Sequence, residues 1–360
     1  MEVEEVYVDI QSQLDNELPF VVYRKPEEKK IYSILQQNDY LYDIKSYNDS
    51  GFIFSPFDTT EKAIIIPVKY STVYCAEYIK YPDKKTAQSK KEEYFDSCSK
   101  AKKKHTDLIV SGIKMINSGT CRKIVLSRSE VVDFENKNII QIFKSLVDSY
   151  PNAFVYCWYH PKIGMWLGAT PETLAKVREN TFSTMALAGT QVYKGTTDVI
   201  WGKKELEEQK MVTEFVVQGL SSVATEISCS QTYTHKAGTL LHLRTDIEAR
   251  IGNSQQSIGG ILQLIHPTPA VCGLPKKEAK SFILENEGYS RKYYTGFLGE
   301  LNIQVNKKWT SNLFVNLRCM EITGDNAILY VGGGITKESD PEKEWIETVR
   351  KTETMKQVLR

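Results

Sequence analysis

The sequence has 360 residues, enough for one large domain or two medium ones, and its 41% hydrophobic and 25% charged residues are typical of a globular protein. Its 46 basic and 45 acidic residues leave a net charge of +1, which argues against broad electrostatic binding to nucleic acid. No apolar run approaches the roughly 18 residues that span a membrane, and the acidic start MEVEEVYVDI has no signal-peptide pattern. We therefore expect a cytoplasmic protein that binds neither nucleic acid nor a membrane.

The metal-binding residue types are scattered. The seven cysteines are odd in number and never form a C-x-x-C pair, and the five histidines show no spacing of the H-E-x-x-H kind. These patterns argue against a disulfide framework and against a zinc site. Any metal bound by this chain is expected to be a hard ion held by carboxylates.

Residues 1–92 are rich in strand-forming side chains and contain no group of residues that indicates chemistry. A helix is predicted over 3–18, and short strands over 20–23, 31–35, 52–54 and 63–68. The lysine-rich stretch 81–93 is the one candidate linker, but it is short, and a helix is predicted over 92–116. We predict a single domain over 1–360, in which 1–92 completes the sheets and 93–360 contains all the motifs that could carry chemistry.

The rest of the chain alternates between strand and helix patterns. Helices are predicted over 139–150, 203–225 and 276–286. Strands are predicted over 124–126, 154–159, 166–168, 173–177, 182–187, 241–251, 293–303, 313–322 and 327–331. Runs of strands with interspersed helices favour an α+β fold with large, mostly antiparallel sheets flanked by helices.

A strand, a glycine run and a helix follow one another near the C-terminus. The strand 327–331 is expected to end in the glycines 332–334, and Asp340 can cap a helix whose first position suits Pro341. Glu344 and Glu347 lie three residues apart on one face of this helix, and Lys351 follows one turn later. Taken alone, this stretch is typical of a solvated helix.

A second pair of glutamates has the same spacing. Glu205 and Glu208 lie on the predicted helix 203–225, just as Glu344 and Glu347 lie on the later one. If the fold brings the two helices face to face, their carboxylates provide oxygen ligands for Mg²⁺. Two solvated helix faces are the default interpretation until such a fold is found.

Four further side chains could carry chemistry. Lys123 opens the run KIVLSR, where a strand anchor that reaches outward is favoured over a general base in a cleft. Glu172, in GATPETL, is either a turn glutamate or a general acid with a raised pKa. Arg318, in the apolar run FVNLRCM, needs an acceptor, which is either a protein carboxylate or an anionic ligand. Tyr294 could donate its hydroxyl to the same anion or be a core aromatic residue.

The order of these motifs resembles the chorismate-utilising enzymes, which include isochorismate, salicylate, anthranilate and aminodeoxychorismate synthases. The resemblance runs from Lys123 to the C-terminus and rests on KIVLSR, GATPETL, LAGT, EEQKMV, HPTPAVCG, YSRKYYTGFLGEL, FVNLR and GGGITKESDPEKEWIETVRK. It implies the fold of anthranilate synthase component I, which is one large domain with two packed, mostly antiparallel sheets and helices outside.

The resemblance also implies roles for individual residues. It implies Mg²⁺ as the cofactor, with Glu208 and Glu347 as direct ligands and Glu205 and Glu344 as water-mediated partners. It implies Lys123 as general base and Glu172 as general acid. The implied contacts with the enolpyruvyl carboxylate of the substrate come from Arg318, Tyr294 and Lys351. The implied backbone lining of the site lies near Gly189, Thr190, Gly332 and Gly334. One departure is Gln209, where many relatives have histidine beside the metal glutamate.

Lys123 also indicates which member of the family this chain resembles most. Members that use ammonia lack a lysine at this position, so the resemblance implies water as the nucleophile and no glutaminase subunit. HPTPAVCG and SDPEKEWIET are most similar to isochorismate synthases, and we expect a monomer that acts on chorismate. A salicylate synthase is the second candidate, and a non-catalytic chorismate-binding paralogue or a nucleotide-binding protein built on the glycine run stays open.

Overall fold

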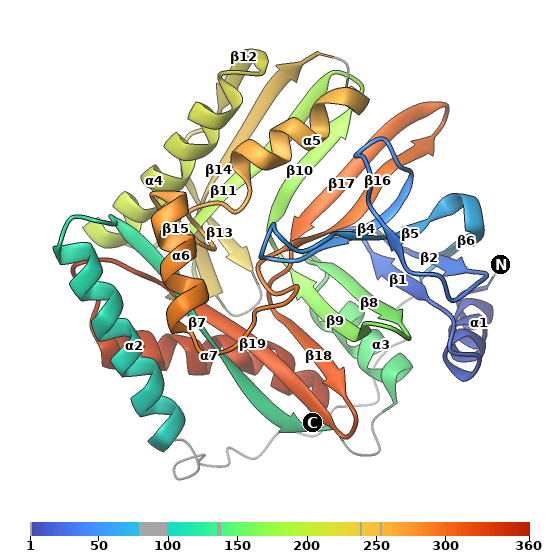
Figure 1. The fold of residues 1–360 in the computed structure, drawn as a ribbon, viewed down its shortest axis with the longest axis horizontal. Coiled ribbons are helices and arrows are strands. Elements are labelled where there is room, and N and C mark those ends of the chain that lie inside the picture. Colours follow the sequence, from blue (N-terminus) through green and yellow to red (C-terminus); the bar gives the residue numbers. More distant parts are fainter. Residues whose placement is uncertain (1, 79–98, 135–137, 238–239, 253) are drawn as a thin grey trace.

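The computed structural model describes residues 2–78, 99–134, 138–237, 240–252 and 254–360, and these residues form two large antiparallel sheets (Figure 1). The first sheet has nine strands among them, in the order β15 (Gly273–Leu274), β7 (Lys123–Asp133), β19 (Asn326–Ile335), β18 (Cys319–Thr323), β9 (Gly164–Thr170), β8 (Phe154–His160), β1 (Phe20–Arg24), β2 (Lys30–Gln36) and β6 (Ser71–Glu77). The predicted α+β fold class is confirmed.

The second sheet has ten strands among the described residues, because β13 pairs with β14 beside the main path. The others are β12 (Ala224–Cys229), β14 (Leu240–Ile251), β11 (Thr181–Val192), β10 (Thr173–Arg178), β17 (Lys308–Val315), β16 (Phe297–Val305), β4 (Gly51–Ser55), β5 (Ile64–Pro67) and β3 (Tyr42–Asp43), and β13 is Tyr233–Ala237. Early strands therefore occupy one end of both sheets, whereas later strands build the other end.

An aromatic core joins the two sheets. Phe54 of β4 packs against Trp158 of β8 with ring centroids 5.0 Å apart, and Phe154 of β8 stacks on Phe314 of β17 at 4.2 Å. These side chains are fully buried, and each is worth roughly 1.5–3 kcal/mol of transfer free energy. The alternating apolar residues of both sheets thus fix how the sheets pack.

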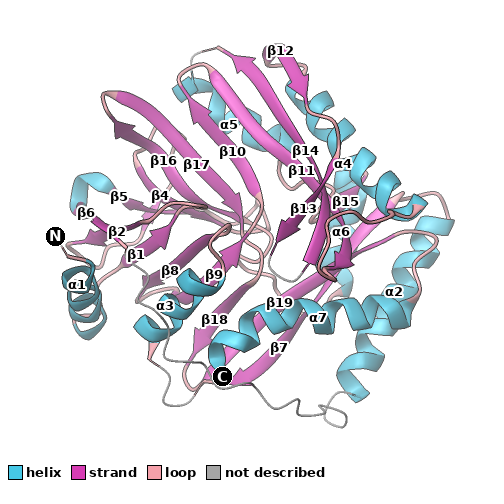
Figure 2. Ribbon diagram, turned by 180° about the vertical axis from the view of Figure 1, so that it is seen from behind, coloured by secondary structure: helices cyan, strands magenta, loops and turns pink. Residues whose placement is uncertain are grey.

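Helices cover the outer faces of the two sheets (Figure 2). They are α1 (Val3–Asp15), α2 (Ser99–Asn117), α3 (Ile139–Ser149), α4 (Lys203–Leu220), α5 (Ser254–Ile265), α6 (Lys276–Asn286) and α7 (Pro341–Leu359). Helices α1 and α3 pack on the first sheet, α4 and α5 pack on the second, and α2 and α6 pack around β7. Over the residues described, no helix is long and apolar enough to cross a membrane.

Helix α7 begins as its sequence predicts and is fixed to β7 by two contacts. The Asp340 side chain accepts a hydrogen bond from the Lys343 N–H, and Pro341 occupies the first turn. Arg128 of β7 stacks over the Trp345 ring at 4.4 Å, and its Nε donates to the Thr348 hydroxyl at 2.9 Å. These contacts set the rotation of α7 and hence the direction of its glutamates.

Several predicted boundaries were wrong. The helix predicted over 203–225 ends at Leu220, because 224–229 pair with β14 as β12. The strand predicted over 293–303 begins at Phe297, and Tyr294 lies in the turn before it. The glycines 332–334 lie inside β19 rather than after it, and α5 was not predicted.

The strand predicted over 313–322 is in fact two strands in different sheets. Strand β17 ends at Val315 in the second sheet, and β18 begins at Cys319 in the first. The chain crosses between the sheets at 316–318, where Arg318 adopts φ 46°. A positive φ is uncommon for a residue other than glycine, and it often marks a functional position. The predicted linker 81–93, the start of the helix predicted over 92–116 and the division after residue 92 lie outside the described residues.

Candidate active site

A cavity lies where the two sheets meet α4 and α7, and it gathers nearly all the predicted site residues. Those that line it are Lys123, Glu172, Gly189, Thr190, Glu205, Glu208, Tyr294, Arg318, Gly332, Gly334, Glu347 and Lys351. The exception is Glu344, which is buried just behind the wall, where its carboxylate meets the cavity-lining Lys204. Segments that are far apart in the sequence therefore converge on one enclosed site.

Lys123 is fully buried at the start of β7, so the strand-anchor interpretation is wrong. Its Nζ lies 2.7 Å from Glu208 Oε1 in a buried ion pair. Burial tends to raise the pKa of the Glu208 carboxyl, but the charge of Lys123 and the more distant Lys204 and Lys351 outweigh it, so the pKa is lowered. A buried lysine that lines the cavity has the position needed for proton transfer.

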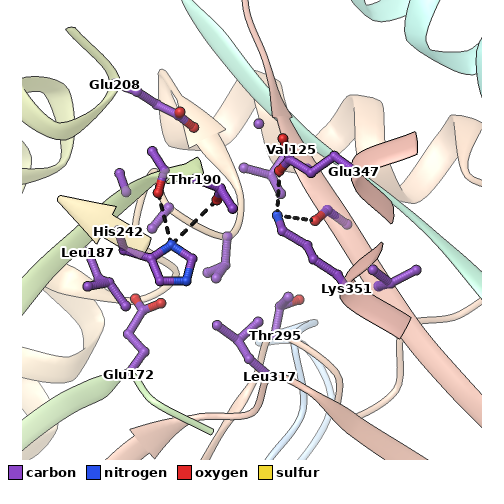
Figure 3. A pocket seen from close by; sticks show the side chains of 18 of the residues that line it. Val125, Glu172, Leu187, Thr190, Glu208, His242, Thr295, Leu317, Glu347 and Lys351 are labelled. Atoms are coloured by element: carbon purple, nitrogen blue, oxygen red, sulfur yellow. Dashed lines mark hydrogen bonds and ion pairs between the residues drawn. The ribbon is translucent and has the colours of Figure 1, made fainter. Parts of the chain in front are cut away.

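Two more of the helix-borne carboxylates also meet lysines. Lys204 Nζ lies 2.5 Å from Glu344 Oε1. Lys351 Nζ lies 2.7 Å from Glu347 Oε1 (Figure 3). Among the described residues, no three His, Cys, Asp or Glu side chains form a group that could hold a metal ion. The glutamates thus line one end of the cavity, but lysine ammonium groups lie between them.

The local structure nevertheless fits a hard cation at this end. Glu344 Oε2 is buried without a hydrogen-bond partner, and it borders Gly333 together with Glu347. A Cβ on the neighbouring Gly334 would overlap Glu208 Oε1. Gly334 therefore makes room for a carboxylate oxygen from α4, and the carboxylates of α7 lie against the neighbouring Gly333. Mg²⁺ needs only one or two protein carboxylates beside water and substrate oxygens, so these donors suit it.

Glu172 lies at the opposite end of the cavity, in the turn between β9 and β10, as Figure 3 shows. Its side chain is 4% exposed. Burial raises the pKa of its carboxyl group to about 8, although the nearby charge of Lys123 acts in the other direction. A carboxyl group with this pKa is protonated at neutral pH and can donate a proton.

Arg318 provides positive charge between these two ends. Its side chain donates to Ala237 O at 3.2 Å and to His242 Nε2 at 3.1 Å, and burial lowers its pKa to about 10. Neither acceptor is anionic, and no carboxylate of the described residues is among the groups that shift the pKa of Arg318. Of the two partners open from the sequence, this arrangement favours the anionic ligand, because a buried cation otherwise lacks its counter-charge.

His242 is a site residue that sequence reasoning missed. Its Nδ1 lies 2.9 Å from Gly189 O and must donate to that carbonyl, so Nε2 is left to accept from Arg318. Burial, together with the charge of Arg318, lowers the pKa of His242 to about 3, which keeps the ring neutral. The signal in the sequence is a histidine within the apolar strand run LHLR, where its ring is expected to be buried. The spacing of histidines tests only for metal ligands and therefore does not find it.

The backbone of β11 and β19 forms part of the cavity wall, at Gly189 and Gly332. Strand β11 has a bulge between Ala188 and Gln191, and Gly189 there adopts φ 69°, a conformation that favours glycine. Gly332 O accepts a hydrogen bond from Lys351 Nζ at 3.0 Å. A backbone carbonyl on each side of the cavity therefore holds a side chain of the site, His242 at Gly189 and Lys351 at Gly332.

Gln209 supports the helix that carries Glu208. Its amide nitrogen donates to Ala186 O at 3.0 Å and to the Thr245 hydroxyl at 2.9 Å. These acceptors belong to β11 and β14, so the glutamine fixes α4 to the second sheet.

Several curated proteins are similar to this chain in sequence. The isochorismate synthase MenF of Escherichia coli is 28% identical over 263 residues, which cover 71% of this chain and 59% of that protein. The vibriobactin-specific isochorismate synthase of Vibrio cholerae is 28% identical over 258 residues, which cover 68% of this chain and 63% of that protein. The matched region thus spans about three fifths of the length of these curated relatives.

A solved structure shares the fold. The structure of MenF, the menaquinone-specific isochorismate synthase from Escherichia coli, matches with a TM-score of 0.76 at 21% identity, over 95% of this chain and 89% of that one. The family model described as chorismate binding enzyme matches residues 63–360. Because this match includes most of the chain and all the cavity-lining residues, the chain belongs to the family of chorismate binding enzymes.

Proposed function

We propose that this chain is an isochorismate synthase, which converts chorismate reversibly to isochorismate with Mg²⁺ as cofactor. The observation that carries the proposal is that buried Lys123 and Glu172 line the same cavity, and that the pKa of Glu172 is raised to about 8. A base and an acid on one substrate suit the addition of water at one carbon and the loss of hydroxyl at another. The names of the relatives support the same reaction.

The positive side chains of the cavity suit a dicarboxylate such as chorismate. Arg318, Tyr294 and Lys351 would bind its side-chain carboxylate, because the Arg318 guanidinium has no carboxylate partner of its own. Glu208 and Glu347, with Glu205 and Glu344 behind them, would hold Mg²⁺. When bound, this ion would neutralise the charge between the glutamates and the ring carboxylate.

The proposed reaction uses water and one proton transfer at each end. The Lys123 amine removes a proton from water as the water oxygen bonds to C2 of chorismate. The ring double bonds shift, the bond from C4 to its hydroxyl oxygen breaks, and Glu172 protonates the departing oxygen. One water is consumed and one is released, so the reaction is an isomerisation. A chain that uses water in this way requires no glutaminase subunit.

Product analysis tests the proposed function directly. Chorismate incubated with the chain and Mg²⁺ is expected to give isochorismate in a mixture that stops at equilibrium, separated by chromatography. Added ammonium salts should yield no amino product, because Lys123 occupies the base position. Salicylate as the main product at neutral pH would assign the chain to the salicylate synthases, and binding without turnover would assign it to the non-catalytic paralogues.

Metal dependence is the second expected outcome. EDTA should abolish turnover and added Mg²⁺ should restore it, and Glu344→Gln should raise the Mg²⁺ concentration for half-maximal rate by about 10- to 100-fold, as loss of an outer partner does. Glu342→Gln, on an exposed side chain of the same helix, is the matched control and should leave that concentration unchanged. Full turnover in EDTA would remove magnesium from the proposal.

A further inference from the structure

A buried ion pair lies beneath the cavity without lining it. Glu287 directly follows α6 and Arg291 lies in the turn after it, and their side chains are 2% and 3% exposed. The guanidinium meets the carboxylate at two points, with Nε 2.8 Å from Oε2 and Nη2 2.5 Å from Oε1. Two parallel contacts fix both the distance and the plane of the pair.

The remaining donors of Arg291 reach three separate parts of the cavity wall. Nη2 donates to Val125 O at 2.7 Å, and Nη1 donates to Val271 O at 2.9 Å and to the Thr295 hydroxyl at 3.1 Å. Val125, Val271 and Thr295 all line the cavity. One side chain therefore connects strand β7, the HPTPAVCG loop and the turn before β16.

Glu287 holds the same strand from the other side of the pair. Its Oε1 accepts from the Ser127 backbone N–H at 2.7 Å and from the Ser127 hydroxyl at 2.8 Å. Ser127 and Val125 belong to the strand that begins with Lys123. The pair thus binds β7 through both a carbonyl and an N–H group close to the proposed base.

The turn that the pair holds has an unfavourable backbone conformation. Thr295 has φ 61° and Lys292 has φ 49°, on either side of Tyr294. Such conformations persist only where surrounding contacts determine them, and Arg291 provides one through Thr295 and another as its carbonyl accepts the Tyr294 N–H at 2.9 Å. The direction of the Tyr294 side chain therefore depends on Arg291.

Stability alone is a weak reason for such a pair. Burying two charges costs desolvation that their attraction often only offsets, and apolar replacements can be as stable. A planar guanidinium instead gives geometry that the point charge of lysine does not reproduce.

We propose that Glu287 and Arg291 are positioning residues that set β7, with its Lys123, against the Tyr294 turn and the Val271 loop. This inference rests on the proposed function, since it assigns the pair to the proposed base and substrate contact.

The test compares Arg291→Lys, Glu287→Gln and the double variant with wild type. Chorismate consumption is divided by the number of binding sites that calorimetry measures, so unfolded protein does not lower the value. Each single variant is expected to lose about 10- to 100-fold in turnover per site, as misplaced reacting groups do. The double variant should lose no more than Arg291→Lys alone, because partners in one unit are not additive.

Glu300→Gln is the matched control. Glu300 is also 2% exposed and accepts from Tyr23 at 2.6 Å and Asn312 at 2.8 Å, but it does not line the cavity. Glu300→Gln should keep turnover per binding site within about twofold of wild type, because residues that share no contacts act independently. A purely structural pair would lower the number of sites in all variants and leave turnover per site unchanged.

Two results would overturn the positioning role: unchanged turnover per site in the single variants, or losses that multiply in the double variant. If Arg291→Lys does not fold, Glu287→Gln alone decides by the same criterion. Because the assay follows chorismate consumption, it is independent of product identity. A wild-type product other than isochorismate would overturn the proposed function, whereas the comparison of turnover per site would still judge the pair.

Discussion

Lys123→Ala is expected to lower turnover by at least about 10²-fold, the usual minimum loss for a positioned base. The Lys123 side chain is fully buried on the wall of the cavity, and its Nζ lies 2.7 Å from Glu208 Oε1. Chorismate binding should persist, because the variant leaves Arg318 and Tyr294 in place. Turnover and calorimetric binding of the folded variant measure the two effects separately.

Lys25→Met provides the control for losing a lysine that pairs with a buried glutamate. Lys25 Nζ lies 2.9 Å from Glu300 Oε1, and its side chain is 16% exposed. Because it lies away from the cavity, its loss should change stability rather than turnover. If Lys123→Ala retains more than a tenth of wild-type turnover, Lys123 is not the base.

Glu172→Gln is expected to lose about 10²- to 10⁴-fold in turnover, because the amide cannot protonate the departing hydroxyl. In the wild type, kcat/KM should fall as pH rises through about 8, the pKa to which burial raises Glu172. The residual activity of the variant should lack this alkaline limb. The fall of kcat/KM at low pH is assigned to the interacting titratable groups of the cavity together, rather than to one residue. An alkaline limb that survives in Glu172→Gln would assign it to another group.

The same carboxyl group should affect stability with a defined sign. Its folded pKa, about 8, lies above the ordinary value of 4.5, so the folded state holds a proton that the unfolded state releases between these values. The contribution of Glu172 to stability is therefore complete below pH 4.5 and is lost as pH rises to about 8, by up to about 1.4 kcal/mol per pH unit. Denaturant unfolding should find wild type losing stability relative to Glu172→Gln across this window, and parallel curves would contradict the raised pKa.

Helix caps, helix bounds and side-chain spacing could be predicted because they depend on residues close together in the sequence. The cap at Asp340 and the bounds 276–286 of α6 follow from helix periodicity and end signals, and the structure has them as predicted. The spacing of Glu344 and Glu347 also placed both on one face, although it could not tell whether that face met solvent or α4. The family resemblance provided that pairing of the two helices.

The features that sequence reasoning missed depend on contacts between distant segments. Nothing in FVNLRCM indicates that the chain changes sheets at 316–318, because apolar strands in either sheet have the same pattern. Lys123 was expected to reach solvent, since the sequence cannot show that Glu208 of α4 lies beside it. The glycines 332–334 suggested a turn, yet they lie in a strand, where a Cβ on Gly334 would overlap Glu208 Oε1 and a Cβ on Gly332 would come within 2.8 Å of Leu126 O.

The pairing of β7 with β19 also has a consequence for how the chain folds. Ile124 pairs with Ile335 and Asp133 with Asn326, so β7, which pairs with β15 only at Lys123 and Ile124, acquires its long partner strand after most of the sequence has been made. Contacts of such high sequence separation require loop closure before they stabilise anything, which slows folding. During synthesis, β7 should thus remain an open edge until the C-terminal segment emerges from the ribosome. We expect chaperone dependence and aggregation to be greatest for nascent chains that end between these two strands.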